Sequence, residues 1–111
     1  SNYFLFKCFE KIITKKELLY GYHGGEFETS IMLHLHPELI KINKIKKSKL
    51  SSDINSKKII SYEKTIKRAW NTKDLSETGI IGNPTNSSAD KGKKILDLTS
   101  RTLKKIINEM K

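Results

Sequence analysis

The hydrophobic and polar positions follow one another in short blocks that predict both strands and helices. Residues 3–9 are a run of aromatic and apolar side chains, which predicts a short, largely buried strand. Residues 10–19 are mixed and rich in lysine, so they predict either a weak helix or a loop. Glycines at positions 21, 24 and 25 then indicate a flexible joint around His23.

The next block predicts a helix over Glu26–Leu35. Phe27, Ile31 and Leu35 recur at four-residue spacing and form one apolar stripe. Acidic residues in the first turn suit the positive end of a helix dipole. Pro37 disfavours helical geometry in the residue before it, so the helix ends there or restarts over residues 37–40.

The middle of the chain is its most polar part. Residues 41–58 contain seven lysines and predict an exposed excursion. Residues 57–62 predict an edge strand, where lysine discourages unwanted pairing. Residues 79–82 form a very short apolar run bounded by glycines, and the following Asn83-Pro84 predicts a turn.

The last predicted element is an amphipathic helix. Ser87 to Asp90 have the spacing of a capping box, with Ser87 as the N-cap. Beyond it, the residues of one face recur every three or four positions: Ile95, Thr99, Leu103, Ile106, Ile107 and Met110. A stripe of this kind has to pack against another surface.

Length and composition then restrict the class of protein. The 111 residues permit one small domain over residues 1–111. No stretch approaches the ~20 apolar residues of a spanning helix, and the first residues lack the pattern of a secretory signal. We therefore expect a cytoplasmic protein that does not contact a membrane. A single cysteine, Cys8, excludes an internal disulfide and a zinc cluster built of cysteines.

The net charge of +10 is less informative than its size suggests. It arises from 22 Lys+Arg against 12 Asp+Glu, yet only Arg68 and Arg101 are arginine. Abundant lysine, isoleucine and asparagine is typical of an AT-rich coding sequence, whereas a nucleic-acid reader more often uses arginine for bidentate contacts. A basic nucleic-acid binder using residues 41–58 is therefore the least favoured function.

Reactive side chains are densest in residues 23–30. His23 can give or take a proton near neutral pH, and Gly24 and Gly25 allow a ligand to approach the backbone closely. Glu28 follows five residues later and can reach back to the imidazole if the chain turns at the glycines. The block therefore predicts an acid–base pair, His23 and Glu28, beside a ligand-binding loop.

Three rival sites are weaker. A zinc site built from His23, His34 and His36 fails because residues two apart on a helix point to different sides. An esterase-like oxyanion loop lacks the Gly-x-Ser-x-Gly nucleophile elbow. Cys8 as a nucleophile is disfavoured because it lies in an apolar run. We assign no metal ligand in this chain.

Residues 23–33, His-Gly-Gly-Glu-Phe-Glu-Thr-Ser-Ile-Met-Leu, resemble a His-Ala/Gly-Gly-Glu-x-Glu-Thr-Ser-x-Met-Leu block of the creatinine amidohydrolase (creatininase) family. Residues 35–40 resemble that family's Leu-x-Pro-Asp-Leu-Val. Residues 79–84 and 88–92 resemble its Gly-Val-x-Gly-Asp-Pro segment and the Ala-x-x-Lys-Gly opening of its last helix. The resemblance covers most of residues 20–111, apart from the lysine-rich stretch.

The resemblance implies an α/β fold, part of a three-layer α/β/α sandwich with a mostly parallel sheet, ending in an amphipathic helix. It implies metal-dependent hydrolysis of a C–N amide bond. His23 then corresponds to a proton donor or oxyanion partner, and Glu28 to another residue around the active site. Tyr20, Gly24 and Gly25 correspond to positions beside the substrate.

Part of the family pattern is missing. Family members are about twice as long, and their Glu-x-His and Asn-Gly-His metal-ligand motifs do not occur here. We therefore expect the carboxy-terminal half of such an enzyme: it needs the missing amino-terminal half or a partner chain, and it forms a homo-oligomer. Alone it holds no metal and is inactive, whereas the complete enzyme holds a zinc or manganese pair.

The substrate class follows from the residues before the histidine. Creatinine hydrolases carry Trp-Asp where Leu19 and Tyr20 stand here, so another small amide is favoured over creatinine. The alternative from a different class is a non-catalytic interaction module or remnant.

Overall fold

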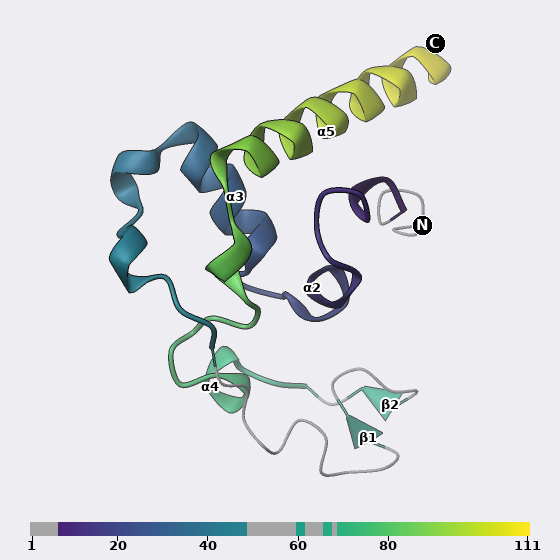
Figure 1. Ribbon diagram of the computed structural model, residues 1–111. Helices are drawn as coiled ribbons and strands as arrows, with labels where there is room; N and C mark the ends of the chain where they lie inside the picture. Colours follow the sequence, from purple (N-terminus) through teal and green to yellow (C-terminus); the bar gives the residue numbers. More distant parts are fainter. Residues whose placement is uncertain (1–6, 49–59, 62–65, 68) are drawn as a thin grey trace.

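The computed structural model describes residues 7–48, 60–61, 66–67 and 69–111. Most of these residues are helical, and the two longest helices are α3 (Glu26–Leu35) and α5 (Ala89–Glu109) (Figure 1). The shorter elements are α2 (Lys15–Tyr20), η1 (Pro37–Leu39), η2 (Ile42–Lys44), β1 (Ile60–Ser61), β2 (Ile66–Lys67), α4 (Thr72–Leu75) and η4 (Pro84–Asn86).

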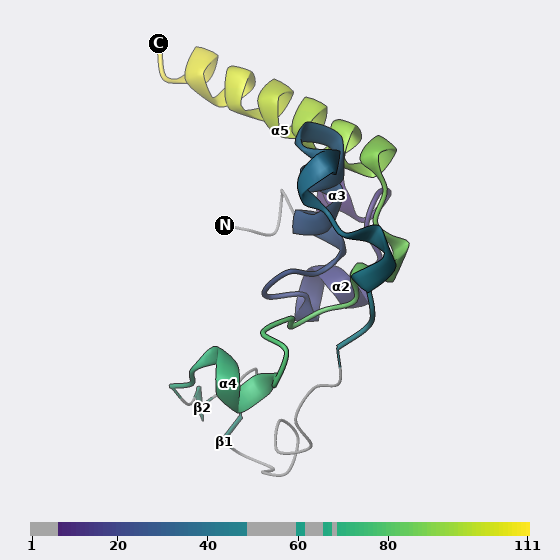
Figure 2. The same ribbon diagram turned by 90° about the vertical axis from the view of Figure 1, so that its left-hand side faces the viewer.

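Helix α5 lies against α3, and a glycine makes the close approach possible. A Cβ atom on Gly92 would lie 2.0 Å from the carbonyl oxygen of Ser30, which is fully buried. Only a residue without a side chain lets the two backbones come this near. The amino-terminal half of α5 is therefore held against α3, whereas its other half extends past the body of the molecule (Figure 2).

The hydrophobic core lies where this helix pair meets the amino-terminal segment. Phe9, Ile13 and Ile95 are buried there, and the ring of Phe9 meets that of Phe27 edge to face at 5.1 Å. Partly buried neighbours surround them: Ile12, Leu18, Phe27, Ile31 and Leu98. Three segments that are distant in sequence therefore share one small core.

The strand predicted over residues 3–9 is wrong in the part that the structure describes. Residues 7–9 are helical, and residues 1–6 lie outside the described residues. The apolar run is nevertheless a core segment, because Phe9 is buried. A short apolar run indicates burial but does not distinguish a strand from a helical turn.

The predicted three-layer α/β/α sandwich is also wrong for the described residues. The strands described there, β1 and β2, pair in parallel over two residues each, with Ile60 opposite Ile66. In this part of the chain burial comes from helix packing on helix, not from helices covering a sheet. The run over residues 79–82 cannot extend as a strand because Gly79 and Gly82 have φ angles of +81° and +156°.

The helix predicted over residues 26–35 is confirmed with the same bounds, and the 3-10 helix η1 follows after the cap residue His36. The carboxy-terminal helix is present, but its N-cap is Ser88 rather than Ser87, because the Ser88 hydroxyl accepts the Lys91 N–H. Asp90 instead contacts Lys94 at 2.7 Å, and this hydrogen bond holds the pKa of Asp90 below its usual range.

Two other predicted segments are described in part. Within residues 10–19 the helical alternative is right from Lys15 onward. In the lysine-rich stretch, the lysines at positions 41, 44, 46 and 47 are exposed, whereas Ser48 is buried and its hydroxyl lies 2.9 Å from that of Ser76. Residues 49–58 lie outside the described residues, and of the predicted edge strand only residues 60–61 are described. No helix among the described residues has the length and apolar character needed to cross a bilayer.

Candidate functional site

The predicted site is a glycine-containing loop between two helices. Helix α2 ends at Tyr20 with Gly21 as its C-cap, and Gly25 is the N-cap of α3. Between them Gly24 has a φ of +60°, which favours a residue without a Cβ atom. His23 forms an antiparallel bridge with Ile81: its N–H donates to the Ile81 carbonyl at 3.2 Å and its carbonyl accepts the Ile81 N–H at 2.7 Å.

The turn brings Glu28 back toward His23. The Gly24 N–H donates to the Glu28 carboxylate, and Glu28 Oε2 lies 3.9 Å from His23 Nδ1. The side chains of His23 and Glu28 are 66% and 56% exposed, so both reach solvent. The two candidate catalytic residues are therefore neighbours on an open surface.

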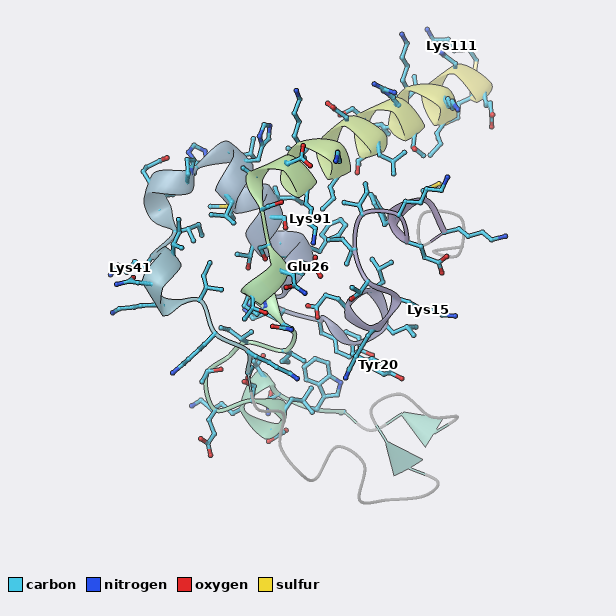
Figure 3. All side chains as sticks on the ribbon, viewed as in Figure 1. Lys15, Tyr20, Glu26, Lys41, Lys91 and Lys111 are labelled. Carbon is cyan, nitrogen blue, oxygen red and sulfur yellow. The ribbon has the colours of Figure 1, made fainter. Side chains whose placement is uncertain are left out.

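Tyr20 is the last residue of α2 (Figure 3). It lines a cavity of about 730 Å³ together with Thr14, Lys16, Glu17, Glu26, Lys47, Ser48, Gly82, Asn83 and Asn86. His23, Gly24, Gly25 and Glu28 are not among the lining residues. Of the predicted substrate-binding residues, Tyr20 therefore lines this cavity, whereas Gly24 and the buried Gly25 do not.

The sequence pattern does not identify Glu17 as part of the site, although this residue organises the loop. Glu17 is only 8% exposed, and its carboxylate accepts the Glu26 N–H at 3.0 Å and the Asn83 N–H at 3.0 Å. The Thr14-x-x-Glu17 spacing is a detectable signal, but it predicts a capping box in which the glutamate bonds to the N-cap N–H. Here Thr14 accepts the Glu17 N–H, and the glutamate carboxylate turns toward residues 9 and 66 positions away.

A second buried carboxylate joins α3 to the start of α5. Glu26 is 2% exposed and is paired with the ammonium group of Lys91, which also donates to the Asn86 carbonyl at 2.8 Å (Figure 3). Next to it, the Ser88 N–H donates to the Ser30 hydroxyl at 3.3 Å. The blocks at residues 23–33 and 79–92, which are separate in sequence, therefore meet in space.

The described residues do not assemble a metal site. No three of their His, Cys, Asp or Glu side chains gather closely enough to hold an ion. His34 and His36 are exposed, and His36 Nδ1 lies 3.1 Å from Glu38. A pair of divalent metals would need ligands from outside the described residues.

Comparisons with known proteins agree with these motifs. The model of the family described as creatinine amidohydrolase matches residues 3–107. The search of curated proteins found no match. A solved structure from Bacteroides fragilis, assigned as a creatinine amidohydrolase, is similar to this chain with a TM-score of 0.52 and 26% sequence identity.

The motif blocks that meet at the start of α3 and α5 are those of an amidohydrolase family. The family match spans nearly the whole sequence, so the chain belongs to the creatininase family. The structural match covers 84% of this chain but only 38% of the Bacteroides fragilis protein. The chain therefore spans well under half the length of that relative.

Proposed function

We propose that this chain contributes His23 and Glu28 to the active site of an enzyme that hydrolyses the C–N bond of a small amide. Membership of the creatininase family supports this reaction class. The observation that carries the assignment of residues is the turn at Gly24, which brings the Glu28 carboxylate to 3.9 Å from the imidazole of His23.

The geometry suits proton transfer by His23. A carboxylate beside Nδ1 favours the tautomer in which Nδ1 carries the proton, and this leaves Nε2 able to accept a proton during the reaction. At 3.9 Å the contact is longer than a hydrogen bond, and catalytic contacts often tighten only when substrate is bound. His23 would then accept a proton at Nε2 from the attacking water and pass it to the departing amine nitrogen, while Glu28 would hold the ring.

The proposal requires other residues to complete the site. His23 and Glu28 are both more than half exposed, whereas hydrolytic sites are enclosed so that charges inside them act strongly. A bound divalent metal would polarise the amide carbonyl and activate water, but the described residues do not fit a zinc or manganese pair. We propose that the remaining part of a family domain holds the metals, and that this chain alone is inactive.

The substrate is proposed to be a small amide other than creatinine. The positions before His23 are occupied by Leu19 and Tyr20, which offer an apolar surface and a phenol at the end of α2. Tyr20 is partly exposed and lines the cavity near the loop, so its hydroxyl is available to a ligand there.

A non-catalytic interaction module is the second candidate. The observation in its favour is the apolar stripe on the free half of α5, formed by Leu103, Ile106, Ile107 and Met110, all of which are exposed. Exposed apolar patches mark interaction surfaces. This candidate predicts that His23 has no effect on any reaction.

The direct test uses a chimera in which this chain replaces the portion of the Bacteroides fragilis protein that it covers. Amide hydrolysis is measured by amine release from a panel of small amides. We expect His23→Ala to lower the rate by about 10²–10⁴-fold, because a proton donor in the transition state is lost.

The matched control is His34→Ala, which removes an exposed histidine from α3. It should leave the rate within about twofold of that of the unaltered chimera. Full activity in His23→Ala would make His23 a surface residue and favour the interaction module.

A further inference from the structure

Glu17 uses its carboxylate in an unusual way for its position on a helix. It is the third residue of α2, where a glutamate ordinarily bonds back to the N-cap. Instead Oε1 accepts the N–H groups of Glu26 and Asn83, and Oε2 accepts that of Asn83 as well, all at 3.0 Å. One side chain therefore joins two backbone segments that are 57 positions apart.

Both donors are groups that regular structure leaves unpaired. The Glu26 N–H is the first of α3, and Asn83 is the N-cap of η4. An ionised acceptor makes such hydrogen bonds roughly twice as strong as neutral ones, and a negative charge is also favoured at the start of a helix. Glu17 is therefore well suited to fix where α3 begins.

Three glycines surround the same carboxylate oxygen. A Cβ atom would lie 2.5 Å from Glu17 Oε1 on Gly21, 2.0 Å on Gly25 and 2.4 Å on Gly82. A side chain at any of these three positions would displace the carboxylate from its present place. The local sequence thus leaves space for the carboxylate on both sides of the loop that carries His23.

His23 lies between the segments that Glu17 joins. Its backbone is bridged to Ile81, one residue before Gly82 and two before Asn83. On its other side the chain reaches Glu26 within three residues. Since Glu26 and Asn83 bond to one carboxylate, the backbone around His23 is held from both directions.

We propose that Glu17 is a positioning residue for His23. It fixes the His23–Glu26 loop against residues 81–83 and does not itself contact the reacting atoms. The proposal rests on the proposed function, because positioning of His23 matters only if His23 takes part in the reaction.

Nuclear magnetic resonance of the full chain tests the geometry without requiring activity. Glu17→Gln keeps the shape of the side chain but removes its charge. We expect hydrogen exchange at the Glu26 and Asn83 amides to accelerate by about tenfold or more, and the amides of His23 and Ile81 to shift. The amide of Ile95, in the core, reports global stability and should keep its exchange rate.

Glu77→Gln is the control, because it removes the same charge from an exposed residue. It should leave all of these amides unchanged. Unaltered exchange at Glu26 and Asn83 in Glu17→Gln, or an equal acceleration at Ile95, would overturn the proposal.

The chimera supplies the second readout. There Glu17→Gln should lower kcat by about tenfold with KM little changed, since the variant disturbs the orientation of His23 rather than substrate binding. An unchanged kcat would contradict positioning even if the amides respond. If instead the unaltered chimera is inactive while the amides respond as expected, it is the proposed function that fails.

Discussion

Lys91 shows how a single residue stabilises the contact between the two motif blocks. Its ammonium group pairs with the buried carboxylate of Glu26 and donates to the Asn86 carbonyl. Removing Lys91 leaves the Glu26 carboxylate buried without its partner, and this lowers the free energy of unfolding far more than the loss of a surface ion pair does.

We predict that Lys91→Ala lowers the free energy of unfolding by about 3 kcal/mol. Lys93→Ala removes the same charge from an exposed position of α5 and should change the free energy of unfolding by less than about 0.5 kcal/mol. Urea denaturation of the two variants measures the difference. Equal effects would mean that the Glu26–Lys91 pair contributes nothing specific.

The sequence separation between contacting residues explains which side-chain contacts could be predicted. Glu28 lies only five residues after His23, and one glycine turn separates them, so the local sequence pattern was sufficient to predict that they are close. Glu17 bonds to Asn83 across 66 positions, and no local pattern contains that information. Its spacing from Thr14 even indicates a different partner.

At the scale of elements, α3 was predictable because its signals are local and agree. Its first turn is acidic, its apolar residues recur at helical spacing and Pro37 disfavours its continuation. The start of α5 was displaced by one residue because two serines, Ser87 and Ser88, stand at the possible N-cap.

Strands were harder to predict because their existence depends on neighbours. Residues 7–9 are helical although their composition suits a strand, and residues 79–82 contribute an isolated bridge through Ile81. The expected sandwich came from the resemblance to a longer domain, and the described residues do not reproduce it.

Replacing Gly92 by alanine tests the α3–α5 contact, because two opposing effects act on the stability of this variant. Alanine favours a helix interior over glycine by about 1 kcal/mol. However, its Cβ atom would lie 2.0 Å from the Ser30 carbonyl and 2.9 Å from the Cβ atom of His34. We expect this overlap to dominate, so that Gly92→Ala destabilises the protein by roughly 1–3 kcal/mol.

Ser100→Ala is the matched comparison, since Ser100 is exposed in the same helix. It should raise the stability slightly through helix propensity alone. Thermal unfolding followed by circular dichroism distinguishes the two variants, and a higher Tm in Gly92→Ala would show that the helices are not in close contact.

For the whole molecule, the free half of α5 is the feature that needs explanation. Ile106 lies eleven residues, or about three turns, beyond the buried Ile95, so the face that enters the core continues outward. There Leu103, Ile107 and Met110 are exposed, and Met110 is 81% exposed. We infer that the rest of a family domain covers this face in the complete enzyme.

In isolation the chain should therefore associate with copies of itself through this face. Sedimentation velocity should show concentration-dependent oligomers that the double variant Ile106→Glu, Met110→Glu abolishes. Asn108→Glu places one such charge on another face of the helix, two residues from Ile106 and from Met110, and should leave association intact. A monomer at all concentrations, or an equal effect of Asn108→Glu, would contradict this prediction.

The most direct measurement compares amine release from small amides by the isolated chain and by the chimera with the Bacteroides fragilis protein. We expect no release above background by the isolated chain, because His23 and Glu28 lack the rest of the site, and steady turnover by the chimera. Turnover by the isolated chain would show that its own residues suffice. No turnover by a folded chimera would contradict the assignment of His23 and Glu28 to an amide-hydrolysing site.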